Sequence, residues 1–209
     1  MAAPPLRFIT FEGGEGGGKS TQLRALAETL CGAGQDVVTT REPGGAPGAE
    51  EIRRLLVEGE PGRWAPEAEA LLHFAARAEH LEKVIRPALE AGKWVLCDRF
   101  ADSTLAYQGY GQGVDLAWLK TLRPRVVGAP APGLPLVLDL PVETGLGRAQ
   151  AQQRSERMGA AFHARLRQGF LAIAKEEPAR CVLVDAARPI EAVAGDVTAA
   201  LAKRYGVTL

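Results

Sequence analysis

Short apolar runs rich in β-branched residues alternate along this chain with longer segments whose apolar residues recur at helical spacing. Residues 8–12 form the first run, a glycine-rich turn follows, and residues 23–30 carry a helical apolar stripe. Residues 36–40 form the next short run. A strand, a helix and a second strand in this order predict a parallel crossover unit, with the glycine-rich turn at the carboxyl edge of a parallel sheet.

The same alternation continues toward the end of the chain. We expect helices within residues 46–64, 66–92 and 189–205, and strands at residues 94–97, 136–139 and 181–185. The pattern predicts an α/β fold in which a five-stranded parallel sheet carries helices on both faces. Because the sequence shows no internal repeat and no low-complexity segment, we expect residues 1–209 to form a single domain.

Composition and charge narrow the possible partners. The chain has 209 residues, of which 46% are apolar, and its 25 basic and 25 acidic residues give no net charge. A general affinity for nucleic acid or for an anionic membrane is therefore not expected. No signal peptide and no membrane span is visible. The three cysteines, Cys31, Cys97 and Cys181, are odd in number and widely spaced, which favours buried thiols in a reducing compartment, the cytoplasm.

The glycine-rich turn matches the pattern of a phosphate-binding loop, in which two glycines four residues apart precede Lys and Ser or Thr. Glycine lets backbone N–H groups approach a polyphosphate, and the following helix start adds further donors and partial positive charge. A glycine-rich hairpin is the alternative, but the strand before and the helix after favour the loop. We expect Lys19 to reach the β and γ phosphates and Ser20 to bind Mg²⁺. The residues expected to bind the nucleotide polyphosphate, which the resemblance described below implies to be ATP, are Gly13, Gly14, Glu15, Gly16, Gly17, Gly18, Lys19, Ser20 and Thr21.

A second candidate group is Asp98 followed by Arg99, at the end of the strand at 94–97. The strand would place this carboxylate at the same sheet edge as the phosphate loop, where Mg²⁺ needs a further protein contact, direct or through water. Arg99 would offer a planar pair of donors to a phosphate. An isolated pair of this kind is more often a surface ion pair, but the phosphate loop favours the functional interpretation.

A third group is a cluster of five arginines among residues 148–167, a stretch that contains a single acidic residue, Glu156. The members are Arg148, Arg154, Arg157, Arg165 and Arg167. Arginines near a transferring phosphoryl group stabilise its charge. We expect this role for Arg148, Arg154 and Arg157, and a solvated helix face for the other two.

Several motifs in order resemble those of the bacterial-type thymidylate kinases, P-loop enzymes of the nucleoside-monophosphate kinase group. They lie at residues 11–22, 41–45, 98–100, 103, 106–109 and 185–186. The resemblance covers nearly the whole chain and implies a three-layer P-loop sandwich with an Arg-rich helical lid at about 143–160. It implies transfer of a phosphoryl group from ATP to dTMP, giving dTDP and ADP for dTTP supply. It also implies Mg²⁺ as cofactor and a homodimer formed through residues 66–92.

The resemblance assigns roles to individual residues. Glu15 resembles the family's acidic residue that contacts the sugar 3′-hydroxyl, while Arg77 and Arg99 resemble contacts to the acceptor phosphate and the base. Gly16 lacks the arginine of the eukaryotic-type enzymes, so the lid would have to supply that charge. The residues implied at the thymidine pocket are Arg41, Pro43, Ser103, Tyr107 and Gln108, and Arg188 is the further residue implied at the ATP site.

Two departures from the family pattern concern the base and the lid. The family places an aromatic residue four positions before Arg77, where this chain has His73, and the aromatic residue follows as Phe74. We expect Phe74 to stack on thymine, with a core position as the alternative. In the lid, Met158 and Gly159 replace the aromatic residue and the Glu that usually follow, so which arginine approaches the transferring group is open.

The transfer itself needs no strong general base, because the acceptor phosphate is already an anion. Positioning and charge neutralisation would then carry the reaction.

Functions of other classes remain alternatives. A GTP-binding switch protein would need an Asn-Lys-x-Asp motif, which is absent, and a nucleic-acid motor is disfavoured by the neutral charge. The nearest rivals are a deoxynucleoside kinase and another monophosphate kinase.

Overall fold

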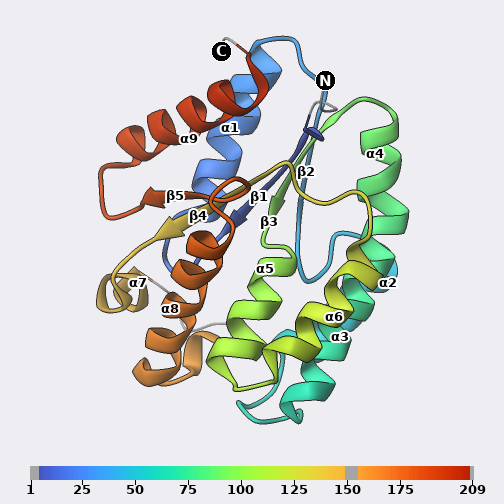
Figure 1. Cartoon of the computed structure of the whole chain (residues 1–209), viewed down its shortest axis with the longest axis vertical. Helices are drawn as coiled ribbons and strands as arrows, with labels where there is room; N and C mark the ends of the chain where they lie inside the picture. Colours follow the sequence, from blue (N-terminus) through green and yellow to red (C-terminus); the bar gives the residue numbers. More distant parts are fainter. Residues whose placement is uncertain (1–4, 149–154, 208–209) are drawn as a thin grey trace.

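The predicted five-stranded parallel sheet is confirmed. A computed structural model describes residues 5–148 and 155–207, and within them the strand order is β2-β3-β1-β4-β5 with every neighbouring pair parallel (Figure 1). The strands are β1 (Phe8–Glu12), β2 (Val37–Arg41), β3 (Trp94–Asp98), β4 (Leu134–Asp139) and β5 (Val182–Asp185).

Helices connect the strands, and each expected helix is present with somewhat different bounds. Up to β3 the helical segments are α1 (Lys19–Gly32), α2 (Pro47–Val57), α3 (Pro66–His80), η1 (Leu81–Ile85) and α4 (Arg86–Glu90). After β3 they are α5 (Ala101–Thr104), η2 (Leu105–Gly111), α6 (Leu116–Val127), α7 (Val142–Arg148), η3 (Ser155–Arg157), α8 (Ala160–Glu176) and α9 (Ile190–Tyr205). The segments α3, η1 and α4 together form the long helix expected at 66–92.

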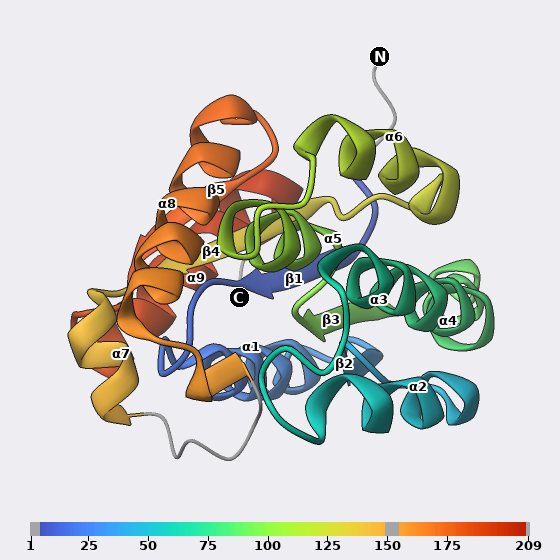
Figure 2. The same cartoon turned by 90° about the horizontal axis from the view of Figure 1, so that it is seen from below.

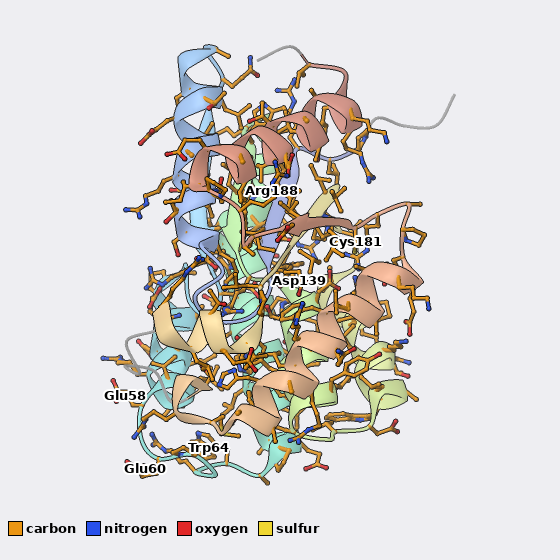
Figure 3. The ribbon with its side chains drawn as sticks, turned by 90° about the vertical axis from the view of Figure 1, so that its left-hand side faces the viewer. Glu58, Glu60, Trp64, Asp139, Cys181 and Arg188 are labelled. Carbon is orange, nitrogen blue, oxygen red and sulfur yellow. The ribbon has the colours of Figure 1, made fainter. Side chains whose placement is uncertain are left out.

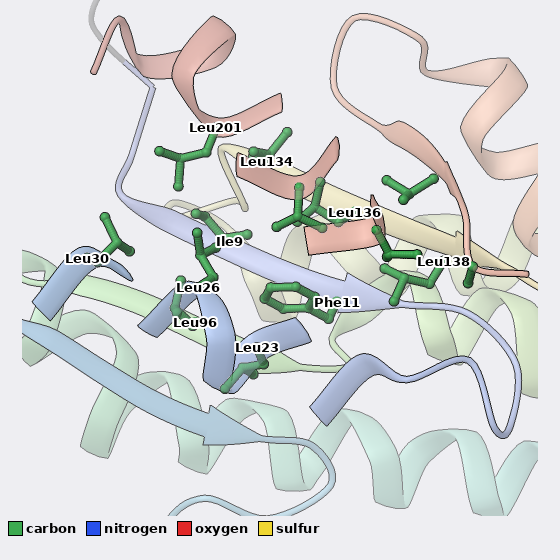
Figure 4. Packing of buried hydrophobic residues seen from close by; sticks show 14 of the residues in the cluster. Ile9, Phe11, Leu23, Leu26, Leu30, Leu96, Leu134, Leu136, Leu138 and Leu201 are labelled. Carbon is green, nitrogen blue, oxygen red and sulfur yellow. The ribbon is translucent and has the colours of Figure 1, made fainter. Parts of the chain in front are cut away.

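Alternating side chains of β1 divide the core between the two faces of the sheet. Ile9 and Phe11 pack with Leu23, Leu26 and Leu30 of α1 and with residues of α9 (Figure 4). Phe8, which precedes Ile9, faces the opposite side and packs with residues of η1 and α4. A strand buried on both faces is typical of a parallel sheet between two helical layers, and Figure 2 shows these layers along the strands.

Two helical segments are π-helices, in which each N–H bonds to the carbonyl five residues earlier. In η1 the Arg86 N–H donates to the carbonyl of Leu81, directly before Pro87, which has no N–H to donate. The second, η2, runs for seven residues and follows α5 without a break. The helical pattern of the sequence predicts neither of these wider turns, because their apolar residues still recur about every four positions.

The register of the sheet brings the ends of three strands together. Phe11 of β1 and Arg41 of β2 both pair with Asp98 of β3. The loops that follow these strands therefore start at one edge of the sheet, the edge that holds the glycine-rich loop. None of the described helices is long and apolar enough to cross a membrane.

Candidate active site

The glycine-rich loop has the backbone conformation that its sequence requires. Gly13 has φ +129°, and a Cβ there would lie 2.4 Å from the carbonyl oxygen of Leu138. Gly18, the N-cap of α1, is left-handed with φ +77°. Glycine is the residue that adopts both conformations without strain. The loop thus curls over the start of α1, whose first N–H groups have no partner within the helix.

Lys19 folds back into this loop. Its Nζ donates to the carbonyl oxygen of Gly14 at 2.6 Å, and the side chain is buried. Burial, together with the nearby positive charge of Arg99, lowers the pKa of Lys19 to about 8. A buried ammonium group held against the loop is placed to meet an anion bound there.

The loop also touches the base of the predicted lid through two glycines. A Cβ on Gly16, which has φ +67°, would lie 2.2 Å from the carbonyl oxygen of Gly145 in α7. In turn, a Cβ on Gly145 would lie 2.5 Å from the carbonyl oxygen of Glu15. The two backbones therefore approach more closely than any side chain would permit, which gives Gly16 a structural reason to carry no arginine.

Ser20 and Asp98 lie side by side as the motifs predict. The Ser20 hydroxyl donates to Oδ2 of Asp98 at 2.5 Å, joining the first turn of α1 to the end of β3. A hydroxyl and a carboxylate oxygen at one point are the hard donors that Mg²⁺ takes from a protein while phosphates and water complete its shell. Among the described residues no group of three or more His, Cys, Asp or Glu forms a separate metal site.

Arg99 links the phosphate loop to the next cavity. Its backbone has φ +69°, a conformation that non-glycine residues seldom adopt. From there Nη1 donates to the carbonyl oxygen of Gly13 at 2.8 Å, and Nη2 donates to Oε2 of Glu15 at 2.9 Å. The strained backbone is held by these contacts, as is common at functional sites.

Glu15 is surrounded by groups that favour its charged form. The Tyr107 hydroxyl donates to its Oε1 at 2.7 Å, and the Ser155 hydroxyl donates to the same oxygen at 3.3 Å. Burial alone would raise the pKa of Glu15, but the positive charges of Arg99 and Lys19 outweigh it and lower the pKa to about 2. The carboxylate is therefore ionised throughout the physiological range and acts as an acceptor only.

A cavity of about 220 Å³ opens beside this cluster. Its predicted ligand contacts come from α1, β2, β3, α3, α5 and η2 and from the loops that follow β1, β2 and β3. The predicted site residues that line it are Glu15, Ser20, Arg41, Pro43, Arg77, Asp98, Arg99, Ser103, Tyr107 and Gln108. The phosphate loop and the cavity therefore share a wall at Glu15, Ser20 and Arg99.

Arg77 is held rigidly in this wall. Its Nε donates to Oε2 of Glu42 at 2.8 Å, and its Nη2 donates to the Phe100 carbonyl at 3.1 Å and to the Thr104 hydroxyl at 3.0 Å. Oε1 of Glu42 lies 3.1 Å from Nδ1 of His80. Because the guanidinium is almost fully buried, its orientation is fixed before any ligand enters.

Comparisons with known proteins agree with this geometry. The family model described as Thymidylate kinase matches residues 11–197. The chain belongs to the thymidylate kinase family. The thymidylate kinase of Caulobacter vibrioides is 54% identical over 96% of this chain and 98% of its own, and that of Ruegeria pomeroyi is 52% identical over 91% and 92%. The crystal structure of the Ehrlichia chaffeensis thymidylate kinase superposes with a TM-score of 0.76 at 38% identity, covering 95% of this chain and 99% of that one.

One prediction about the base pocket needs correction. Phe74 is buried in a hydrophobic cluster with Leu105 and Phe170 and does not line the cavity, whereas its neighbour His73 does. The Arg77 guanidinium lies 5.5 Å from the centre of the Phe74 ring, behind the cavity wall. The prediction that Phe74 stacks on thymine is therefore wrong for this structure, and the alternative of a core residue holds. Helical rotation explains this, because adjacent residues of α3 face directions about 100° apart.

The lid arginines occupy different environments. Arg148 is exposed at the end of α7, and Arg154 lies outside the described residues. Nη1 of Arg157 lies 3.2 Å from both carboxylate oxygens of Glu60, and its Nη2 donates to the carbonyl oxygen of Gly59. Arg157 thus joins η3 to the loop after α2. A role of Arg148, Arg154 and Arg157 toward the transferring phosphoryl group stays a prediction.

Arg165 is exposed and Arg167 is partly exposed on α8, in keeping with the solvated helix face expected, and each also binds a neighbouring element. Arg165 donates to the carbonyl oxygen of Gly111 at 2.8 Å, and Arg167 forms a two-point ion pair with Asp139 at 2.7 and 2.9 Å. Both therefore anchor α8, one to the end of η2 and the other to the end of β4.

Arg188, which the resemblance implies at the ATP site, pairs with Asp196 of α9 at 2.5 Å. Figure 3 shows Arg188 at a distance from Glu60 and Trp64 of the segment between α2 and α3, with Asp139 between them. Arg41, half exposed at the cavity, pairs with Glu50 at 2.9 Å. For both arginines, contact with a nucleotide stays a prediction.

Three buried acidic side chains near the cavity are not predicted as site residues by the sequence. Glu12 accepts a hydrogen bond from Ser103 at 2.6 Å, Glu42 holds Arg77, and Glu69 accepts from Gln108 at 2.9 Å. Each of these residues either interrupts an otherwise apolar face of its segment or follows a strand that ends at the site. The sequence signal for such a residue is a charged side chain at a position where the pattern expects an apolar one.

Proposed function

We propose that the phosphate loop binds ATP, that the adjoining cavity binds dTMP, and that the residues of their shared wall carry the transfer. The reaction follows from the family: ATP and dTMP give ADP and dTDP, a step of nucleotide biosynthesis that supplies dTTP. The observation that carries the site assignment is Arg99, which bonds the phosphate loop at Gly13 and the cavity wall at Glu15.

On the donor side, the loop from Gly13 to Gly18 would surround the ATP phosphates with backbone donors, and Lys19 would leave Gly14 to meet the β and γ phosphates. Ser20 and Asp98 would hold Mg²⁺, directly or through water. When bound there, Mg²⁺ neutralises charge on the phosphates. The pair fits this role because its two oxygens already meet at 2.5 Å beside the loop.

On the acceptor side, Arg99 would contact the dTMP phosphate, and Glu15 would accept a hydrogen bond from the sugar 3′-hydroxyl. Arg77 and Gln108 are buried residues of the cavity lining, where the base would fit. Tyr107 contacts both Arg99 and Glu15. Cζ of Arg99 lies 5.0 Å from the centre of the Tyr107 ring, and the Tyr107 hydroxyl donates to Glu15. Arg41, Pro43 and Ser103 would complete the pocket.

In this arrangement the acceptor phosphate oxygen attacks the γ phosphorus of ATP in line with the departing ADP. The bond from γ phosphorus to the β-bridging oxygen breaks as the new bond forms, and the acceptor needs no proton removed by a strong base. Lys19, Arg99 and the lid arginines would stabilise the charge of the transferring group. Closure of the lid would exclude water and so limit ATP hydrolysis.

A coupled ADP-release assay tests the proposal. The panel of acceptors is dTMP, dUMP, CMP, AMP, GMP and thymidine, with and without DNA. We expect dTMP to be the best acceptor, and we expect Arg99→Ala to reduce turnover about 100-fold or more while the protein stays folded. Near-normal turnover of Arg99→Ala on dTMP would contradict the assignment of the site.

We also propose that the chain acts in the cytoplasm as a homodimer of single kinase domains. Leu71 of α3 is 50% exposed, an apolar side chain on the long helix expected at the interface. All three cysteines are free thiols, although Cys31 is exposed rather than buried as expected. Sedimentation analysis of the wild type and Leu71→Glu tests the dimer, since a charge in an apolar interface shifts the equilibrium toward monomer.

A further inference from the structure

Three buried polar atoms of residues that line the cavity have no hydrogen-bond partner within the part of the chain that the structure describes. They are Nη1 of Arg77, Oε1 of Gln108 and Oε1 of Gln112. A buried polar atom without a partner is costly. Nη1 of Arg77 is a donor and Oε1 of Gln108 is an acceptor, so these two wall groups are complementary to a ligand that offers an acceptor to the first and a donor to the second.

Glu69 fixes the direction of the Gln108 amide. Nε2 of Gln108 donates to Oε1 of Glu69 at 2.9 Å, and Nε2 of Gln112 donates to the same oxygen at 2.8 Å. An ionised carboxylate only accepts hydrogen bonds, so each amide must turn its NH₂ group toward Glu69. The amide oxygen of Gln108 is thereby kept on the other side, as an acceptor.

The donor half of the wall is fixed in a comparable way. The guanidinium of Arg77 has donors only, and Glu42, Phe100 and Thr104 already hold its Nε and Nη2. Glu69 is itself 5% exposed and lies on α3, the same helix as Arg77, whereas Gln108 lies on η2. The donor and acceptor therefore come from two packed elements, and a carboxylate orients each of them.

We propose that Glu69 is a positioning residue that sets base specificity in the acceptor cavity. The proposal rests on the proposed function, because it takes the base to be thymine. Thymine presents O4 as an acceptor and N3–H as a donor, and these match Nη1 of Arg77 and Oε1 of Gln108. Cytosine presents an N4 amino donor and an N3 acceptor, the reverse order. With both wall groups fixed, cytosine would set donor against donor and acceptor against acceptor.

Glu69→Gln removes this constraint while keeping the size of the side chain. A glutamine can accept or donate, so the Gln108 amide can reverse and present its NH₂ group to the cavity. The reversed amide would suit N3 of cytosine and would no longer bond N3–H of thymine. Glu67→Gln is the matched control, since Glu67 is exposed on the same helix.

The test measures kcat/KM for dTMP, dUMP and dCMP with the wild type, Glu69→Gln and Glu67→Gln. We expect Glu69→Gln to lower the ratio of dTMP to dCMP about tenfold or more, mainly through KM, because a site built to bond one edge rejects the other strongly. The ratio of dTMP to dUMP should stay the same, since these bases share the O4 and N3–H edge. Glu67→Gln should leave both ratios as in the wild type.

Equal losses on all three substrates in Glu69→Gln would overturn the proposal and assign Glu69 a structural role alone. An unchanged ratio of dTMP to dCMP at wild-type rates would overturn it as well. Far-ultraviolet circular dichroism and a thermal unfolding curve show whether the variant is folded. Failure of the proposed function is distinguishable, because the wild type would then not phosphorylate dTMP at all.

Discussion

Replacing Glu12 with glutamine should remove a large part of the fall in stability that occurs as the pH rises from 4.5 to about 8. Glu12 ends β1, is fully buried, and accepts a hydrogen bond from Ser103 at 2.6 Å. Burial is the main cause that raises the pKa of its carboxyl to about 8, and the nearby carboxylate of Asp102 raises it further. The hydrogen bond from Ser103 and the charges of Arg99 and Arg77 act in the opposite direction.

Proton linkage gives the sign and the size of the effect that Glu12 has on the free energy of unfolding. The folded protein keeps a proton on Glu12 over a range where the unfolded chain, with an ordinary pKa of 4.5, has lost it. The free energy of unfolding therefore falls as the pH rises from 4.5 to about 8. Each pH unit well inside this window costs about 1.4 kcal/mol, and the cost per unit falls to about half of that near the folded pKa, so the step from about pH 6 to about pH 8 costs about 2 kcal/mol. A glutamine at this position carries no ionisable proton.

Urea unfolding of the wild type and Glu12→Gln at about pH 6 and about pH 8 measures this difference. Groups common to both proteins cancel, so the stability of the variant relative to the wild type should rise by about 2 kcal/mol between the two conditions. Glu28→Gln, an exposed position on α1, is the control and should show no such change. An equal difference at both pH values would refute the interpretation of Glu12 as a buried carboxyl that stays protonated.

Three further predictions concern the donor side and can be checked with the ADP-release assay. Lys19→Ala should lower turnover about 100-fold or more in a folded protein, since it removes a charge-stabilising donor; near-normal turnover would contradict its assignment. Ser20→Ala should raise the Mg²⁺ concentration needed for half-maximal activity, because Asp98 alone would remain for the metal; an unchanged Mg²⁺ curve would argue against this pair. Gly145→Ala should lower activity by displacing the base of the lid, since its Cβ would lie 2.5 Å from the carbonyl oxygen of Glu15; wild-type activity would show that α7 adapts freely.

The sequence predicts the sheet and the phosphate loop well because both depend on local chemistry. A buried strand needs an apolar run, and a loop around phosphate needs glycines at fixed places. The pattern of residues 8–22 therefore predicts their structure directly. The meeting of Ser20 and Asp98 also follows, since parallel strands end at a common edge.

The roles of residues on helices around the cavity are harder to predict. The direction in which such a side chain points depends on how the helix is rotated about its axis, and not on the residue type. Phe74 and His73 are neighbours in sequence, yet one lies in the core and the other at the cavity. The roles of Glu42 and Glu69 depend on partners 35 and 39 residues away, which no local pattern reveals. The same holds for Arg167, whose partner Asp139 lies 28 residues earlier.

The π-helical turn of η2 has a consequence for how the cavity can change in evolution. Ser103 and Gln112 both line the cavity, although nine positions of an uninterrupted α-helix make about two and a half turns and would set them on opposite sides. The wider turns of η2 bring them back to one side. Deleting one residue within η2 would restore the narrower helix and rotate the following residues away from the ligand. Alignments of related enzymes should therefore place insertions and deletions outside residues 105–111, even where the residue types there vary.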